Sequence, residues 1–194
     1  MSKDTVKKGL LIVGSGPSGV GKGTVHSRIL AESPNVTYSI SVTSRKPRIG
    51  ERDGVDYFFR SAEQVKEMIA NDEFLEYADV FGNYYGTPRD YVLQKLNEGK
   101  DVLLEIDVQG ALQVKKRMPE ALLIFLAPPN QQELERRLRN RCTDDEDVIL
   151  RRLHDAEWEL SHKDQYDYVI VNDTVDDTVK KYLSILQKEK EKRK

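Results

Sequence analysis

Glycines, one lysine and hydroxyl side chains are crowded into segment 16–24, which reads GPSGVGKGT. Glycines let backbone N–H groups converge on a polyphosphate, and a lysine in this pattern can reach the β- and γ-phosphates. The spacing G-x-x-x-x-G-K, ending at Lys22, is that of a phosphate-binding P-loop. The pattern indicates binding and transfer of a nucleotide phosphate. The predicted phosphate-binding residues are Gly16, Pro17, Ser18, Gly19, Val20, Gly21, Lys22, Gly23 and Thr24.

Position 23 departs from the usual P-loop, because Gly23 stands where a Ser or Thr hydroxyl normally contacts Mg²⁺. A hydroxyl follows one residue later, at Thr24. We therefore expect the Mg²⁺ that accompanies ATP to be held mainly by nucleotide oxygens and water. Thr24 and Asp107 are candidates to contact the ion through water, and no residue is assigned as a certain direct ligand.

A strand must lead into this loop and a helix must follow it. Leu10–Val13 is an apolar run before the loop, and 25–32 is helix-like. Further apolar runs, read as buried parallel strands, are Ser39–Val42, Val102–Ile106, Leu122–Leu126 and Tyr168–Val171. Helix-like segments lie between or after them, at 109–117, 130–141 and 175–188. The alternation predicts an α/β fold, a doubly wound parallel sheet of about five strands with helices on both faces.

Two regions interrupt this alternation. Segment 43–97 has no long buried strand, but it contains a helix start at Ser61, with Gln64 completing a capping box. We read it as an inserted small α+β substrate-binding subdomain. Segment 136–155 is rich in arginine and predicts a helical lid. The remaining segments (1–42, 98–135 and 156–194) form the core, so residues 1–194 make a single domain.

The composition narrows the function classes. Lys plus Arg number 31 and Asp plus Glu 33, a balance that gives no electrostatic case for binding nucleic acid or membrane. The single Cys142 cannot form an internal disulfide, and the apolar run near the N-terminus is too short for a signal sequence or membrane span. We expect a cytoplasmic protein, either a monomer or a homodimer. His26, His154 and His162 lie in polar helix-like segments and are read as bystanders.

Arg45 and Arg48 lie on either side of Pro47, which disfavours helix at the residue before it. A turned backbone here can direct both guanidiniums at one phosphate, and arginine forks bind phosphate oxygens bidentately. The hydroxyls of Tyr57 and Tyr85 can join them. A solvated basic loop is the alternative interpretation.

The order of these motifs resembles that of guanylate kinases. The resemblance covers almost the whole chain and rests on the P-loop and on the segments TSRKPRIGE (43–51), GVDY (54–57), FLEYA (74–78), GNYYGT (82–87), EIDVQG (105–110), FLAPP (125–129) and VND (171–173). It implies transfer of the γ-phosphoryl group of ATP to GMP, and to dGMP, with Mg²⁺ as cofactor, in purine nucleotide metabolism.

The resemblance also implies a GMP site. Residues matching the two arginines and two tyrosines hold the GMP phosphate, and those matching Ser41, Glu76 and Thr87 face the guanine. An ionised Glu76 can accept from guanine N1–H and the 2-amino group, whereas adenine presents an acceptor at N1 that a carboxylate repels. Asp107 is placed beside either the magnesium water or the guanine amine. The implied GMP-binding set is Ser41, Arg45, Arg48, Tyr57, Glu76, Tyr85, Thr87 and Asp107.

On the ATP side, the residues matching Asn172 and Asp173 contact adenine, and three lid arginines close over the phosphates. The implied catalytic set is Lys22, Arg45, Arg137, Arg141 and Arg152. No catalytic base is needed, because the acceptor phosphate is already anionic at neutral pH. Many family members carry Asp where this chain has Glu105, whose function stays open, an ion pair with an arginine of the 45–48 turn being one possibility.

Three other interpretations are kept. Gly23–Thr24 after the lysine also resembles adenylate kinases, but Glu76 and the motif order favour GMP. A guanylate-kinase-like module that binds phosphopeptides without catalysis is the second, and the intact P-loop with Lys22 argues against it. A P-loop GTPase is the third, and the chain lacks an Asn-Lys-x-Asp motif.

Overall fold

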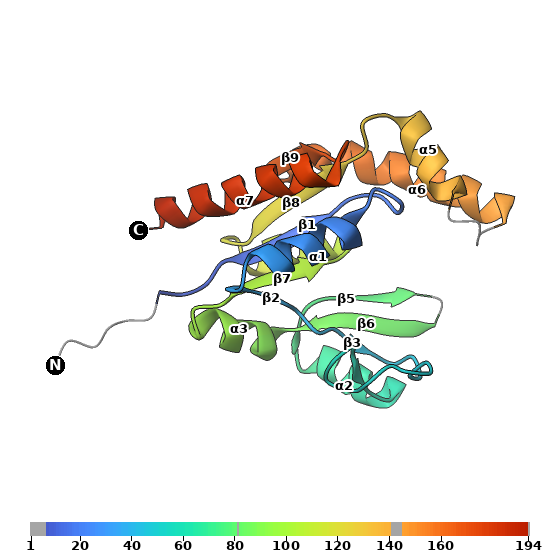
Figure 1. Cartoon of the computed structure of the whole chain (residues 1–194). Helices are drawn as coiled ribbons and strands as arrows, with labels where there is room; N and C mark the ends of the chain where they lie inside the picture. The colour runs from blue at the N-terminus through green and yellow to red at the C-terminus, as the bar shows by residue number, and fades with distance from the viewer. Residues whose placement is uncertain (1–6, 81, 141–144, 194) are drawn as a thin grey trace.

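The computed structural model describes residues 7–80, 82–140 and 145–193. At its centre is a five-stranded parallel sheet with the order β2-β7-β1-β8-β9 (Figure 1). The strands are β1 (Leu11–Ser15), β2 (Val36–Tyr38), β7 (Asp101–Glu105), β8 (Leu122–Ala127) and β9 (Tyr168–Val171). Parallel strands joined by helices confirm the predicted α/β class.

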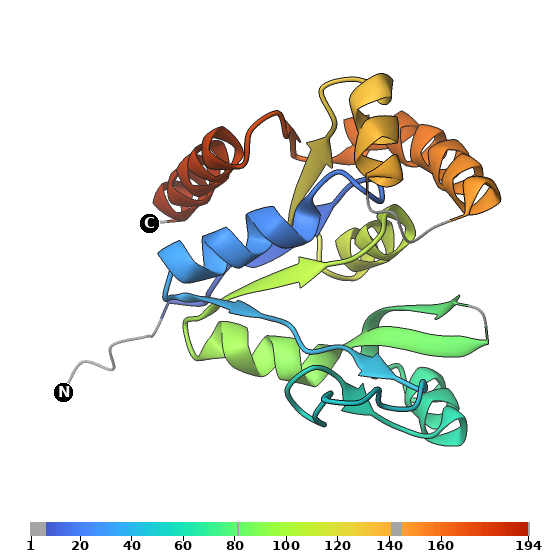
Figure 2. The ribbon, with the colours of Figure 1, turned by 45° about the vertical axis from the view of Figure 1, so that its right-hand side comes forward.

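Helices cover both faces of this sheet (Figures 1 and 2). Side chains of a strand alternate between faces, so Leu103 packs on the side of α1 (Lys22–Glu32) and α7 (Val175–Lys192). Val102 and Leu104 pack on the other side, with α3 (Arg89–Asn97) and α4 (Val108–Arg117). The sheet is therefore doubly wound, as predicted.

One predicted strand was wrong. Residues Ser39–Val42 do not form the second strand of the parallel sheet. Instead β2 (Val36–Tyr38) pairs with β7, and Ser39 only extends that pairing by donating its N–H to the Leu103 carbonyl at 3.0 Å. Val42 is buried in a different core, against Val65 and Phe74, and it begins β3 (Val42–Thr43) of a second sheet. The apolar run thus crosses between two sheets, and periodicity alone could not show that.

The second sheet has four strands in the order β4-β3-β6-β5. They are β3, β4 (Phe58–Phe59), β5 (Phe74–Val80) and β6 (Asn83–Pro88), with α2 (Ala62–Ala70) packed beside them. The predicted capping box is confirmed, because Ser61 Oγ accepts from Gln64 N at 3.2 Å and Gln64 Oε1 accepts from Ser61 N at 2.8 Å. These elements fall within the predicted 43–97 insertion apart from Val42, and the exact division into subdomains stays a prediction.

Two helices follow β8. Asn130 caps α5 (Gln131–Arg139) by accepting from Glu133 N at 2.8 Å, and α6 (Glu146–Ser161) packs on it through Leu134, Leu138 and Ile149. A short 3-10 helix (Lys163–Gln165) leads to β9. Helix α6 runs without a break through residue 155, where the predicted lid ended. The lid itself stays a prediction, and Arg141 and Cys142 lie outside the described residues.

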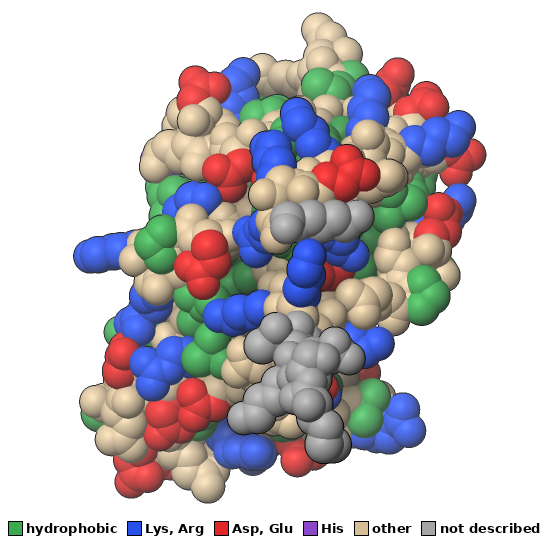
Figure 3. Space-filling view, turned by 90° about the vertical axis from the view of Figure 1, so that its left-hand side faces the viewer, with side chains coloured by type: hydrophobic (Ala, Val, Ile, Leu, Met, Phe, Trp, Pro, Cys, Tyr) green, Lys and Arg blue, Asp and Glu red, His purple; other side chains and the backbone are tan. Residues whose placement is uncertain are grey.

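The segment before β1 and the end of α7 lie at the amino ends of the core strands, away from the P-loop (Figure 1). Several Lys and Arg side chains are visible in the view onto this end (Figure 3). Lys7, Lys8, Lys190 and Arg193 line a cavity of about 430 Å³ there. Across the described part of the chain, no helix is both long enough and apolar enough to span a bilayer.

Candidate active site

The P-loop backbone has a shape that only glycine permits at two positions. Gly16 has a φ of 145°, and a Cβ on it would lie 2.2 Å from the Leu126 carbonyl oxygen. Gly21 has a φ of 99°, and a Cβ there would lie 2.7 Å from Asn172 Nδ2. The loop delivers Lys22 at the start of α1, where the helix dipole favours an anion. The Lys22 ammonium donates to the carbonyl oxygens of Gly16 and Pro17.

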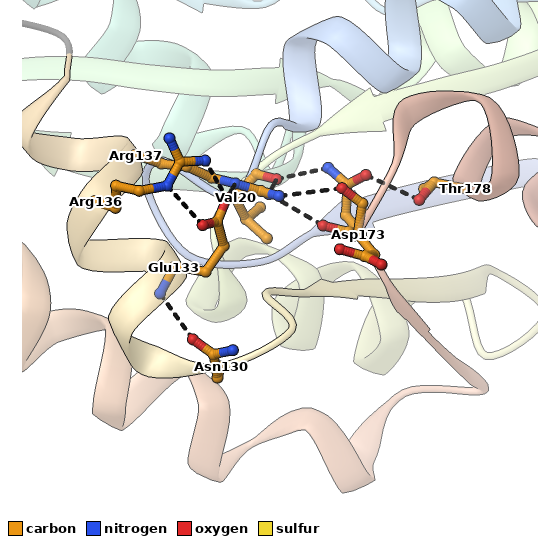
Figure 4. A network of polar contacts seen from close by, with 8 residues as sticks. Val20, Asn130, Glu133, Arg136, Arg137, Asp173 and Thr178 are labelled. Carbon is orange, nitrogen blue, oxygen red and sulfur yellow. Dashed lines mark hydrogen bonds and ion pairs between the residues drawn. The ribbon is translucent and has the colours of Figure 1, made fainter.

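Arg137 of α5 ties the P-loop to the loop after β9 (Figure 4). Its Nη1 donates to the carbonyl oxygens of Val20 (3.2 Å) and Asn172 (3.0 Å), and its Nη2 donates to that of Asp173 at 3.3 Å. Glu133 Oε1 accepts from Nε at 2.7 Å, and hydrogen bonds from Arg136 and Arg137 lower the pKa of Glu133 to about 2. Arg137 therefore lies against the P-loop and the loop after β9, and its contact with the ATP phosphates stays a prediction.

Asn172 joins the same network through its side chain. Its Nδ2 donates to the Val20 carbonyl at 2.7 Å, and its Oδ1 accepts from Thr178 Oγ1 at 2.8 Å. Because the Asn172 side chain is buried and occupied in this way, Asp173 is the more accessible of the two predicted adenine-contacting residues.

A cavity of about 360 Å³ opens beside the P-loop. Its lining residues, from β7, α1, α6 and the loops at their ends, are Ser18, Lys22, Glu105, Ile106, Asp107, Arg152, Asp155 and Glu159. Arg152 Nη1 lies 3.5 Å from Ser18 Oγ, so α6 brings a predicted lid arginine to the P-loop. This is the arrangement expected of a site that binds phosphates.

Glu159 of α6 is a site residue that the sequence reading missed. Burial raises its pKa to about 7, reinforced by Asp107 and Asp155 and opposed by Lys22 and by the hydrogen bond from the backbone of Ser18. A carboxylate that accepts from a P-loop N–H occupies part of an anion-binding surface. Its helical spacing from Arg152, two turns away, is the only signal in the sequence.

Glu76 and Thr87 meet across β5 and β6. Thr87 Oγ1 donates to Glu76 Oε1 at 2.6 Å, and the two side chains are 1% and 7% exposed for Thr87 and Glu76 respectively. Burial raises the pKa of Glu76 to about 7, with Asp107 adding to the shift and Thr87 opposing it. A Cβ on Gly110 would approach Glu76 Oε2 to 3.0 Å, so this carboxylate faces the first turn of α4. Ser41 lies half-buried in the connection between the two sheets.

Asp107 caps α4, because its Oδ1 accepts from Gly110 N at 2.7 Å. It borders both the P-loop cavity and a neighbouring one lined by Gln109, Trp158 and Glu159. Since β7 ends at Glu105, Asp107 lies beyond the strand, in the turn that begins α4.

Three of the side chains predicted to hold the GMP phosphate lie close together beside the second sheet. Arg45 lies 5.5 Å from the Tyr57 ring centre, and the rings of Tyr57 and Tyr85 are 6.1 Å apart. Glu51, which was not predicted as a site residue, accepts from Arg45 Nη2 at 2.8 Å and from the backbone N–H of Arg48 at 2.7 Å. These two hydrogen bonds lower the pKa of Glu51. The Arg48 side chain is exposed.

His26 is buried and hydrogen-bonded, although it was expected to be a bystander in a polar helix-like segment. It is 1% exposed, and its Nδ1 lies 2.7 Å from Glu105 Oε2. A carboxylate can only accept, so Nδ1–H is the donor. Burial opposes ionisation of Glu105, but this hydrogen bond and the charges of His26 and Lys22 hold its pKa below the usual value. An ion pair with Arg45 or Arg48 was one possibility for Glu105; among the described contacts Glu105 pairs with His26 instead. Val25 and Ile29 beside it mark the buried face of α1.

The donor set suits a metal that arrives with a nucleotide. Within residues 7–80, 82–140 and 145–193, no group of three or more His, Cys, Asp or Glu side chains could hold a metal ion by itself. Mg²⁺ needs no such group, because it is commonly bound by one or two carboxylates together with substrate phosphates and water. Glu105 and Asp107 border the cavity beside Lys22, while Thr24 is exposed on α1.

Comparison with known proteins identifies the family of this chain. The guanylate kinase family model matches residues 8–189. The chain is 58% identical over 171 residues to a guanylate kinase of Bacillus cereus, covering 88% of this chain and 83% of that one. It is 51% identical over 187 residues to one of Carboxydothermus hydrogenoformans, covering 96% and 92%. A crystal structure of guanylate kinase from Anaplasma phagocytophilum has a TM-score of 0.73 at 36% identity, covering 94% and 87%. The chain belongs to the guanylate kinase family.

Proposed function

We propose that this protein transfers the γ-phosphoryl group of ATP to a phosphate oxygen of GMP, and of dGMP, giving ADP and the corresponding diphosphate. The bond between the β-bridging oxygen and the γ-phosphorus of ATP breaks, and a bond from the acceptor phosphate oxygen to that phosphorus forms. The observation that carries the proposal is the buried Glu76–Thr87 pair, which lies at the first turn of α4 beside Asp107, and Asp107 lines the P-loop cavity. Membership of the guanylate kinase family supports it.

Glu76 is assigned to the guanine base. Its ionised carboxylate accepts from N1–H and the 2-amino group, while Thr87 and Ser41 supply hydroxyls for O6. Asp107 lies near enough to act electrostatically on Glu76 and to face the base amine. A buried acceptor without a partner is costly, so a base with an acceptor at N1 is rejected.

Arg45, Arg48, Tyr57 and Tyr85 are assigned to the acceptor phosphate. In the absence of a ligand, Glu51 accepts from the Arg45 guanidinium at 2.8 Å, and that guanidinium lies beside the rings of Tyr57 and Phe59. The phosphate of GMP then adds a second anion to a guanidinium that is already oriented, which lowers the entropy cost of binding.

On the donor side, the P-loop amides and Lys22 receive the ATP phosphates, with Arg137, Arg141 and Arg152 closing from the predicted lid. Arg141 lies outside the described residues and is assigned from the resemblance alone. Asn172 and Asp173 border the adenine. Lys22 and the lid arginines are the cations that bring the donor and acceptor phosphates into line and stabilise the charge of the transferred group. Positioning and electrostatics therefore supply the catalysis.

Mg²⁺ is the proposed cofactor, and when bound it neutralises charge on the β- and γ-phosphates. Glu105 and Asp107 are the side chains placed to contact its water. Closure of the 43–97 and 136–155 segments excludes water from the site, which prevents hydrolysis of ATP. The single Trp158 borders the cavity next to Asp107, so its fluorescence reports this closure. We further propose a cytoplasmic location.

A coupled assay for ADP tests the proposal, with ATP, Mg²⁺ and GMP, dGMP, AMP, CMP or UMP offered separately. We expect turnover with GMP and dGMP only. Turnover with AMP at a comparable kcat/KM would move the assignment to adenylate kinase. Folded protein that turns over none of them would indicate a phospho-ligand-binding module instead.

A further inference from the structure

One face of α4 carries the contacts between the second sheet and the main core. The apolar face of this helix packs in the same core cluster as β1, β7 and β8. Gly110, Gln113 and Arg117 are spaced by three and four residues, so they share a neighbouring face. All three meet β5 or the turn that leads into it. Because Asp107, the N-cap of α4, lines the P-loop cavity, this face links the second sheet to the P-loop.

The Gln113 side chain pairs with the backbone of β5. Strand β5 is an edge strand that pairs only with β6 among the described strands, so its outer N–H and C=O groups have no strand beside them. Gln113 Oε1 accepts from Tyr77 N at 3.3 Å, and Gln113 Nε2 donates to the Tyr77 carbonyl oxygen at 3.2 Å. Tyr77 directly follows Glu76, so these two hydrogen bonds fix the backbone beside the carboxylate that is assigned to guanine.

Asp72, in the turn before β5, has a backbone conformation that favours glycine. Its φ is 56°, and no other residue except glycine has a positive φ in the part of the chain that the structure describes. The turn ends α2, with Asp72 N donating to the Ile69 carbonyl and Glu73 N to the Met68 carbonyl. Glycine is the usual residue at this position of such a helix end. An aspartate here strains the backbone, which suggests that its side chain has a function.

The Asp72 carboxylate joins the turn to two helices of the main core. It forms an ion pair with Arg117 of α4, and its Oδ2 accepts from Nη1 of Arg89, the first residue of α3, at 3.0 Å. The Asp72 side chain is 59% exposed, and ion pairs between exposed side chains contribute little to stability. What these ion pairs do is hold the start of β5 in one place.

Two further contacts complete the attachment of β5 to α4. Leu75 is 1% exposed and lies in the main core cluster with residues of α3 and α4. A Cβ on Gly110 would lie only 3.0 Å from Glu76 Oε2, so the lack of a side chain there allows the close approach. Segment 72–77 is therefore attached to the main core along its length, and the position of Glu76 relative to the P-loop depends on these contacts.

We propose that Gln113, Arg117 and Asp72 are positioning residues for phosphoryl transfer, because by holding β5 on α4 they set where Glu76 places the guanine relative to the P-loop. The inference rests on the proposed transfer to GMP. Closure of the 43–97 segment then turns about this attached edge. Displacement of a reacting group by about 1 Å can cost about 100-fold in rate, so the loss of one contact should appear in the turnover of GMP.

Gln113→Leu tests the contact with Tyr77, because leucine is similar in size and can form neither hydrogen bond. We expect kcat with GMP to fall at least about tenfold while the KM for ATP stays within about twofold. Hydrogen exchange of the Tyr77 amide, followed by NMR, should accelerate at least about fivefold. Gln94→Leu on α3, where the amide bonds only to Glu98 among the described residues, is the matched control and should change none of these. A normal kcat or an unchanged Tyr77 exchange rate in Gln113→Leu would overturn the inference.

Asp72→Gly separates positioning from stability. Glycine suits a φ of 56° but carries no carboxylate, so the thermal midpoint should stay within about 4 °C of the wild type while kcat with GMP falls. Arg117→Lys keeps a cation opposite Asp72 and should retain most of the activity that Arg117→Met loses. Equal kcat values in these two Arg117 variants would contradict the proposal. Folded wild-type protein that does not phosphorylate GMP would contradict the proposed function itself.

Discussion

Thr87 donates its hydroxyl hydrogen to Glu76 Oε1 at 2.6 Å, and both side chains are withdrawn from solvent between β5, β6 and α4. This contact satisfies one carboxylate oxygen and leaves Oε2 against Gly110. A carboxylate kept in such a place costs folding energy, which is the expected sign of a group retained for binding.

Glu76→Gln should remove the preference for GMP. The Gln amide has one acceptor oxygen in place of two, so it cannot accept from both guanine donors. Hydrogen bonds to charged groups contribute about 1.5–3 kcal/mol each. We expect kcat/KM for GMP to fall about 100-fold or more, while the KM for ATP stays within about threefold. Glu73→Gln, at a half-exposed carboxylate just before β5, is the matched control. Near-normal use of GMP by the Glu76 variant would remove the base assignment.

The same substitution should stabilise the ligand-free protein at high pH. The pKa of Glu76 is raised by burial from 4.5 to about 7, so its protonated form is the favoured one. The stability that it contributes is complete below pH 4.5 and is lost as the pH rises through 7. Ionisation at pH 8 therefore costs up to about 3 kcal/mol, which Gln avoids. Urea unfolding at pH 5 and pH 8 measures this, and an equal effect of Glu76→Gln at both pH values contradicts it.

GMP binding should weaken as the pH falls below 7, because protonated Glu76 cannot accept from both guanine donors. The phosphate of GMP also titrates, near pH 6, so the wild type must be compared with Glu76→Gln. We expect the GMP dissociation constant of the wild type to rise more steeply between pH 7.5 and 5.5 than that of the variant, as measured by calorimetry. Parallel curves would show that Glu76 is not the titrating group.

Neighbouring arginines on α5 offer a matched pair. Arg137 donates to the carbonyl oxygens of Val20 and Asn172, whereas Arg136 donates to the Glu133 carboxylate (Figure 4). Arg137→Met should lower kcat/KM for ATP about 10- to 100-fold and leave GMP affinity within about twofold, since the P-loop and the adenine-side loop lose their common tie. Arg136→Met should stay within about twofold of wild type. Steady-state kinetics with each nucleotide varied measure both variants. Equal effects of the two substitutions would show that the Arg137 contacts do not support the use of ATP.

Two glycines of the P-loop should respond differently to alanine. Gly21 has a φ of 99° and no room beside Asn172, so Gly21→Ala should cost at least about 1–2 kcal/mol in the free energy of unfolding and weaken ATP binding. Gly23 lies inside α1 with ordinary space around it, so Gly23→Ala should be neutral or stabilise by up to about 1 kcal/mol. Denaturant titration of both variants measures this difference. A Gly21→Ala protein at least as stable as the Gly23→Ala protein would contradict the prediction.

Local pattern was enough for much of the fold and for part of the site. The apolar runs at Leu122–Leu126 and Tyr168–Val171 lie in β8 and β9, because a parallel strand buried on both faces is a nearly continuous run of apolar residues. The P-loop was predicted from the apolar run before it, from its glycines and from the helix-like segment after it. The strand predicted at Ser39–Val42 failed because the chain there passes from one sheet to the other, and the reason lies in distant residues such as Val65 and Phe74.

Two of the missed residues have partners that are far away in the sequence. His26 meets Glu105 across 79 positions, so polar flanking residues suggested an exposed ring. Glu159 faces Ser18 from a helix whose docking no local pattern specifies. Glu51 is close to Arg45 in the sequence, but the two side chains meet only because the chain turns between them. The exact functions of the predicted site residues stay predictions until nucleotides are bound and substitutions are measured.

The most direct measurement follows the phosphoryl group itself. Wild-type protein and Lys22→Met are incubated with γ-labelled ATP, Mg²⁺ and GMP, and the label is located after chromatography. The account predicts label in the β-phosphoryl of GDP in equal amount to the ADP formed, with the Lys22→Met rate lower by about 100-fold or more. Label recovered only as inorganic phosphate, or retained in ATP by protein shown to be folded, would contradict phosphoryl transfer to GMP.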